Sequence, residues 1–138
     1  MHKYLEIRQE SSSDFTEISE LIRKEFLQFD EKPSEPQLVI NLRNNEAHVP
    51  KLCVVAVIRN KVVGHIFYTN LKLKHKPKAI KFLALAPVSV LPEYQGKGIG
   101  SILIKETISE ARSLGYGAII LVGHAKYYSR FGFKKLSS

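Results

Sequence analysis

Apolar and polar residues alternate with different periods along the 138-residue chain. Near the N-terminus, residues 4–7 alternate with period two and predict a strand. Two stretches with apolar residues at helical spacing follow, each opened by a capping-type pair, Asp14 with Glu17 and Ser34 with Gln37. The residues expected to be buried are Ile18, Leu21, Ile22 and Phe26 in the first helix and Leu38, Val39 and Leu42 in the second.

Beyond Pro50 the pattern changes to β-branched runs. Residues 52–58 and 62–73 are joined by "RNK" and predict a hairpin. Residues 79–91 are almost wholly apolar, as expected for a strand at the centre of a sheet. Pro87 lies inside this strand and has no N–H to donate, so we expect a bulge or a splay there.

The last third predicts a helix over 101–114, a buried strand over 117–123 and a short helix over 124–131 ended by Gly132. Gly115 stops the first of these helices, whose expected inner face is Ile102, Leu103, Ile108 and Ala111. The order is β-α-α-β-β-β-α-β-α. A strand–helix–strand unit near the end implies at least one parallel pair. We therefore expect an α/β (α+β) mixed sheet with helices on both faces.

Bulk properties favour one domain over residues 1–138. No apolar run approaches the roughly 18 residues that span a bilayer, and the N-terminus has no signal-type apolar core. The chain has one cysteine, Cys53, which excludes a disulfide framework. This residue is either a small buried hydrophobe or a reactive thiol. We expect a cytoplasmic protein without a membrane partner.

The net charge of +8 invites a polyanionic partner such as nucleic acid, a membrane surface or a phosphorylated small molecule. Much of the excess lies at Lys72, Lys74, Lys76 and Lys78, which also fit a solvated hairpin protected from edge aggregation. Because no aromatic residues interleave with these lysines, a stacking platform for nucleic acid is not indicated.

Three glycines occur in the stretch "QGKGIG", residues 95–100. Walker-loop spacing is absent, and a dinucleotide fingerprint fails because Ser101 stands where a third glycine is needed. The remaining interpretations are a flexible turn, or a strand–turn–helix whose free N–H groups hold an anion.

The segment "VSVLPEYQGKGIGSILI" resembles the signature segment of the GNAT superfamily of N-acetyltransferases, with Gln95, Gly98 and Gly100 at its defining positions. A second segment, "GHAKYYSRFGF", is similar to the late segment of a bacterial branch, in which a tyrosine, here Tyr128, lies four residues before a Gly-Phe pair. The resemblance implies a GNAT-like acyl-CoA N-acyltransferase fold: a mostly antiparallel sheet with one splayed parallel pair that takes acetyl-CoA as cosubstrate.

By this resemblance the N–H groups of residues 96–101 hold the cofactor's pyrophosphate, and Gln95 shapes the turn. Val88 and Val90 pair with the pantetheine arm, and the Val90 N–H polarises the thioester carbonyl. The cofactor-binding residues so implied are Val88, Ser89, Val90, Gln95, Gly96, Lys97, Gly98, Ile99, Gly100 and Ser101.

The implied reaction is direct attack of an amine on the thioester. Tyr128 is the candidate acid that protonates the leaving sulfur, with Tyr127 in reserve. Many family members carry a glutamate on the strand before the glycine turn, but "FLALAPVSV" contains no acid. His124, His65 or a water chain is the candidate base. The other histidines, His2, His48 and His75, show no metal-type spacing, so we expect no metal.

Relatives continue past the Gly-Phe pair through two more strands, so the C-terminal strands are expected to be shortened and strand 117–123 to have an unpaired edge. A second copy, a folded-back tail or an inactive shortened relative would each account for this. Two functions follow: an N-acetyltransferase acting on a small-molecule or peptide amine, or a non-catalytic acyl-CoA or CoA-binding module or sensor. The acceptor stays open, and nucleic-acid binding rests on charge alone.

Overall fold

The computed structural model describes residues 4–71 and 80–121. The strands are β1 (Leu5–Gln9), β2 (Val54–Ile58), β3 (Lys61–Leu71), β4 (Lys81–Val90) and β5 (Tyr116–Leu121). The α-helices are α1 (Phe15–Phe26), α2 (Glu35–Arg43) and α3 (Ile99–Ser113), and the short 3-10 turns are η1 (Ser12–Asp14), η2 (Pro50–Leu52) and η3 (Pro92–Tyr94). The predicted element order is confirmed as far as β5. The helix expected over 124–131 lies outside the described residues.

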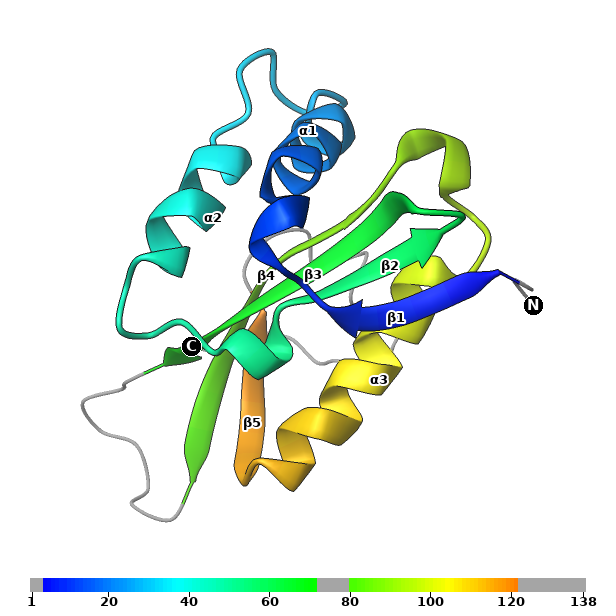
Figure 1. Ribbon diagram of the computed structural model, residues 1–138. Coiled ribbons are helices and arrows are strands. Elements are labelled where there is room, and N and C mark those ends of the chain that lie inside the picture. The colour runs from blue at the N-terminus through cyan, green and yellow to red at the C-terminus, as the bar shows by residue number, and fades with distance from the viewer. Residues whose placement is uncertain (1–3, 72–79, 122–138) are drawn as a thin grey trace.

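The strands form one mixed sheet in the order β1-β2-β3-β4-β5. The first three neighbouring pairs are antiparallel, whereas β4 and β5 are parallel. Helices α1 and α2 lie on one face and α3 on the other (Figure 1). The β2–β3 hairpin turns through Arg59 and Asn60, whose φ angles of 49° and 66° fit a two-residue type I′ turn. The mixed sheet with helices on both faces confirms the predicted fold class. No helix in the described ranges is long and apolar enough to cross a bilayer.

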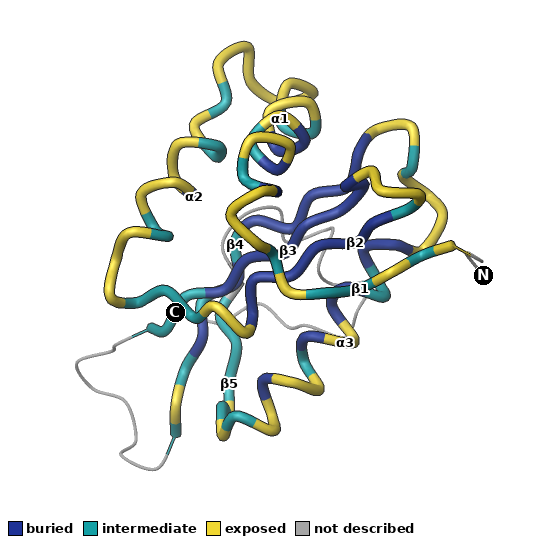
Figure 2. The backbone as a smooth tube through the Cα atoms, viewed as in Figure 1, coloured by how far each residue is buried: buried dark blue, intermediate teal, exposed yellow. Residues whose placement is uncertain are grey.

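The core lies against the central strands β2 and β3 (Figure 2). On one face, Gly64 lets α3 come close, since a Cβ there would lie 3.0 Å from Leu103 Cδ1 and 3.1 Å from Ile99 Cγ2. The buried hydroxyl of Tyr68 is hydrogen-bonded to Thr107 Oγ1 of α3 at 2.7 Å. On the other face, α1 buries Ile18, Leu21 and Ile22 as predicted, whereas the fourth predicted residue, Phe26, is only half-buried.

The buried faces of α2 and α3 differ from the prediction. Helix α3 begins at Ile99, and because β3 approaches it at Gly64, the row through residues 99, 103 and 107 lies against the sheet. Ile102 is consequently only half-buried, and its assignment to the inner face was wrong. In α2, Val39 is buried but Leu38 is 41% exposed, so its predicted burial was also wrong.

The start of α1 is capped differently from the predicted pair of Asp14 with Glu17. The Asp14 carboxylate accepts the Ser11 N–H at 2.8 Å, one turn earlier than expected, and also binds the Arg8 guanidinium at 2.8 and 2.9 Å. The Glu17 carboxylate instead accepts the Val62 N–H at 2.8 Å. Glu17 therefore ties α1 to β3 rather than capping its own helix.

The register between β3 and β4 shifts around Pro87. Ile66 is opposite Val88, whereas Tyr68 is opposite Leu85, so the bulge predicted at the proline is confirmed. The parallel pairing of β4 with β5 covers only Lys81–Leu85 of β4. From residue 86 to 90, β4 therefore has β3 on one side and no described strand on the other.

Candidate functional site

The glycine turn connects η3 to α3 through two left-handed residues. Gly96 and Gly98 have φ angles of 77° and 83°, which glycine adopts without the steric cost a side chain would bring. A Cβ at either position would meet no atom of residues 4–71 or 80–121 within 4 Å, so this part of the chain leaves the space beside the turn open. Gly98 is the N-cap residue, and its carbonyl accepts the first helical hydrogen bond, from the Ile102 N–H at 3.1 Å.

This turn leaves an electropositive helix end facing the open space. The first N–H groups of a helix have no intrahelical partner, and the helix dipole adds positive potential there. No side chain among the described residues caps this end, and the first turn of α3 contains no acid. The geometry therefore suits an anion such as a phosphate.

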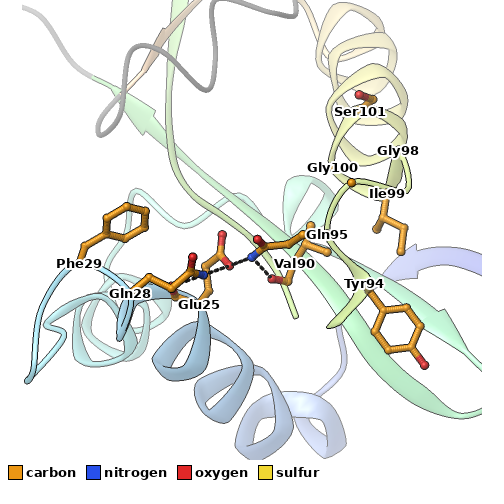
Figure 3. Close-up of a pocket in the computed structure, with 11 residues that line it drawn as sticks. Glu25, Gln28, Phe29, Val90, Tyr94, Gln95, Gly98, Ile99, Gly100 and Ser101 are labelled. Atoms are coloured by element: carbon orange, nitrogen blue, oxygen red, sulfur yellow. Dashed lines mark hydrogen bonds between the residues drawn. The ribbon is translucent and has the colours of Figure 1, made fainter. Parts of the chain in front are cut away.

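A cavity of about 530 Å³ opens beside this helix end. Its wall is formed by the end of α1, the last residue of β4, η3, the glycine turn and the first turn of α3 (Figure 3). The lining residues are Glu25, Gln28, Phe29, Val90, Tyr94, Gln95, Gly96, Gly98, Ile99, Gly100 and Ser101. Of the ten predicted cofactor-binding residues, the structure brings all but Val88, Ser89 and Lys97 into this wall.

Gln95 links three parts of the site. Its Nε2 donates to the Val90 carbonyl at 3.1 Å and also to the carboxylate of Glu25 (Figure 3). The turn is thereby held to the end of β4 and to the last turn of α1.

Glu25 was not predicted from the sequence. Burial raises the pKa of its carboxyl to about 7, although a hydrogen bond from Gln28 Nε2 at 3.3 Å acts in the opposite direction. In the sequence it is one of several acids on a helical stretch. Only the fold brings it beside its partner Gln95, which is 70 positions away in the chain. No local signal distinguishes it.

The β4 segment beside the cavity is buried and paired with β3. Val88, Ser89 and Val90 lie opposite Ile66, His65 and Gly64. The Ser89 Oγ is buried without a hydrogen-bond partner among the described residues. The Nδ1 of His65, the residue opposite Ser89 on β3, is also buried without such a partner.

His65, one candidate base, lies in a buried polar cluster rather than in the cavity wall. Its Nε2 is 2.8 Å from Glu10 Oε1, and Arg43 donates to both Glu10 oxygens at 2.8 and 3.1 Å. Burial lowers the pKa of His65, which keeps the imidazole neutral. Burial would raise the pKa of Glu10, but the hydrogen bonds from His65 and Arg43 outweigh it and lower this pKa to about 2.

Glu10 also meets His48 and Cys53, with ligand-type atoms within 4.8 Å of one another. No spacing of these residues along the chain predicts such a group. Both Glu10 oxygens already bind Arg43, and burial raises the pKa of the Cys53 thiol to about 12, so the thiol stays protonated. Since a metal needs a thiolate and a free carboxylate, these residues fit a metal poorly.

The remaining candidates, Tyr128, His124 and the reserve Tyr127, lie outside the described residues. The same holds for the lysines at 72, 74, 76 and 78.

Comparisons with known proteins agree with this geometry. Residues 15–133 match the model of the Acetyltransferase (GNAT) family. The uncharacterized N-acetyltransferase YjhQ of Escherichia coli is 39% identical over 100 residues, which cover 72% of this chain and 55% of YjhQ. The chain thus spans about half the length of that relative.

Two solved structures are also similar. A GNAT family acetyltransferase from Brucella melitensis in complex with acetyl-CoA matches with a TM-score of 0.84 and 34% identity, covering 97% of this chain and 85% of that one. YhbS from Escherichia coli in complex with CoA matches with a TM-score of 0.79 and 26% identity, covering 95% and 69%.

Proposed function

Because the chain belongs to the Acetyltransferase (GNAT) family, we propose that it transfers an acetyl group from acetyl-CoA to a primary amine by direct attack. The observation that carries the proposal is the uncapped N-terminus of α3, which faces an open cavity through two left-handed glycines. The Brucella relative, similar over almost the whole of this chain, is in complex with acetyl-CoA, which supports the same cofactor here.

In this proposal the N–H groups of residues 96–101 bind the pyrophosphate. The pantetheine arm lies along residues 86–90 of β4, where that strand has no described neighbour beyond β3. Val88 and Val90 bind the arm through their backbone, and the Val90 N–H polarises the thioester carbonyl. Tyr128 protonates the leaving sulfur.

Calorimetric titration with acetyl-CoA tests the cofactor site. Gly98→Asp places a carboxylate beside the helix end, and a like charge about 4 Å from a phosphate costs on the order of 4 kcal/mol at an effective dielectric constant near 20. Affinity should fall at least about 100-fold. Gly115→Asp is the matched control, since Gly115 also has a positive φ, 90°, but lies at the far end of α3. No binding by the folded chain would refute the proposal.

A second candidate is a CoA-binding module without turnover. The absence of a carboxylate from β4 favours it, because many relatives carry their base there. Thiol release from acetyl-CoA separates the two functions, using a lysine peptide, spermidine, an amino-acid amide and an aminoglycoside as acceptors. Cofactor binding without release above the buffer rate for every amine would favour the module; release that Tyr128→Phe abolishes would favour the enzyme.

A further inference from the structure

The cavity is lined by a carboxylate from α1, whereas β4 contains no acidic residue. Among the described residues that line the cavity, Glu25 is the only acid. It lies in the last turn of α1, where the negative end of the helix dipole disfavours a carboxylate. The helix dipole therefore does not account for an acid at this position, whose carboxylate contacts the Gln95 side chain and the cavity.

The carboxylate is held close to the end of β4. Gln95 Nε2 donates both to Glu25 and to the Val90 carbonyl, so the two acceptor oxygens lie within about 6 Å, the reach of two hydrogen bonds that share one nitrogen. In the proposed function Val90 lies beside the reacting thioester. Glu25 is thus near the place where an acceptor would attack.

One oxygen of Glu25 is fixed and the other is available. Gln28 and Gln95 both donate to Oε2, and Oε1 accepts no hydrogen bond from a described residue. A carboxylate offers about four lone-pair sites, so Oε1 can accept from a ligand while Oε2 keeps the group in place. In Figure 3 the side chain lies between Gln28 and Gln95, on the opposite side of the cavity from the start of α3.

We infer that Glu25 binds the ammonium group of the acceptor and takes its proton as the nitrogen attacks the thioester; this inference rests on the proposed function. The two ends of the cavity then have opposite tasks. The uncapped helix end takes the anionic pyrophosphate, and the carboxylate takes a cation through a charge-assisted hydrogen bond. Phe29, which lines the cavity and is 61% exposed, adds a ring that also attracts cations.

The transfer moves two protons and one acetyl group. One ammonium proton moves to Glu25 and is later lost to water, which leaves a neutral amine. The nitrogen lone pair forms the C–N bond, the C–S bond breaks, and its electron pair goes to sulfur. The nitrogen then loses a second proton. The acid Tyr128 protonates the leaving sulfur and is restored by that second proton. The products are the amide, the CoA thiol and one proton.

The acidity of Glu25 suits this role, because a general base works best when its pKa is near the working pH. Burial raises this pKa to about 7. The titratable groups nearest in sequence to the lining residues are Arg23 and Lys24 on α1, Asp30, Glu31 and Lys32 after it, Glu93 and Tyr94 on η3, and Lys97 in the turn. The carboxyl is therefore charged above about pH 7 and neutral below it.

The test compares Glu25→Gln with Glu20→Gln, the same chemical change at an exposed position of the same helix. For the amine that gives the fastest thiol release, kcat/KM of Glu25→Gln should fall about 100-fold at pH 8, and the rise of the rate through pH 7 should disappear. Glu25→Asp should recover part of the rate. Glu20→Gln should keep both the rate and the pH profile.

Calorimetry with CoA and thermal unfolding complete the test. Glu25→Gln should bind CoA within about threefold of the unchanged protein, because a glutamine oxygen can still accept from Gln95. Its melting temperature should be unchanged or higher. A rate within threefold at pH 8, or an equal loss of CoA affinity and rate, overturns the inference and leaves the acetyltransferase intact. If the unchanged protein binds no acetyl-CoA or acetylates no amine, both proposals fail.

Discussion

Acid should destabilise this protein measurably through one buried group, Glu10. Its side chain is 4% exposed and accepts hydrogen bonds from His65 and Arg43. The pKa of this carboxyl is lowered from 4.5 to about 2 in the folded chain. Because the folded state holds the proton less tightly than the unfolded state, the carboxylate stabilises the fold above pH 4.5. That stabilisation is lost as the pH falls toward 2.

The size of the effect follows from the two pKa values. At about 1.4 kcal/mol per pH unit, the full difference is about 3 kcal/mol, of which about 2 kcal/mol is lost by pH 3. Glu10→Gln cannot titrate. It should be less stable than the unchanged protein by about 3–5 kcal/mol at pH 7, since the Arg43 guanidinium loses its buried partner. The gap between the two should shrink by about 2 kcal/mol at pH 3.

Urea unfolding followed by circular dichroism at pH 7, 5, 4 and 3 measures this gap. Asp14, whose pKa is also lowered by its hydrogen bonds with Arg8, contributes to both proteins and cancels in the difference. Glu110→Gln, an exposed change on α3, controls for the loss of one carboxyl. A gap that stays constant from pH 7 to 3 would refute the reasoning. If Glu10→Gln alone does not fold, adding Arg43→Met removes the unpaired charge and allows the same measurement.

Three further changes test the packing around the site. Gly64→Ala should destabilise the fold by about 1–3 kcal/mol in urea unfolding, because its Cβ would press on Leu103 Cδ1; a neutral result would mean that α3 shifts freely. Tyr68→Phe should cost about 1 kcal/mol by the same measurement, since its hydroxyl is bonded to Thr107, and an unchanged stability would contradict this. The Cys53 thiol, whose pKa burial raises to about 12, should react with a thiol reagent only as fast as the protein unfolds, and rapid labelling of native protein would argue against the buried position.

The strands and helices were predictable because their signals are local. The hairpin turn at residues 59–60 follows from two β-branched runs separated by a short polar stretch, and the bulge follows from a proline in an apolar strand. The phase of α3 was not predictable in the same way. Which row of a helix is buried depends on where the sheet comes closest, and that place is set by Gly64 on another element.

The glycine turn could also be predicted from the sequence. The left-handed backbone and the open helix end both depend on residues that are adjacent in the chain. The charged parts of the site were not. Glu10 meets His65 across 55 positions and Arg43 across 33, and each alone is an ordinary polar residue. Only burial at a common place makes them a network with shifted pKa values.

Placing the carboxylate on α1 separates the recognition of the two substrates. The cofactor would be bound by residues 86–101, a continuous stretch that contributes backbone N–H groups and whose turn is held by the Gln95 side chain. The acceptor would meet Glu25 and Phe29, at the end of α1 and the start of the polar connection to α2. Changes in residues 27–34 could then alter which amine fits without disturbing the pyrophosphate site. A base on β4 would instead have tied the proton acceptor to the strand that binds the cofactor.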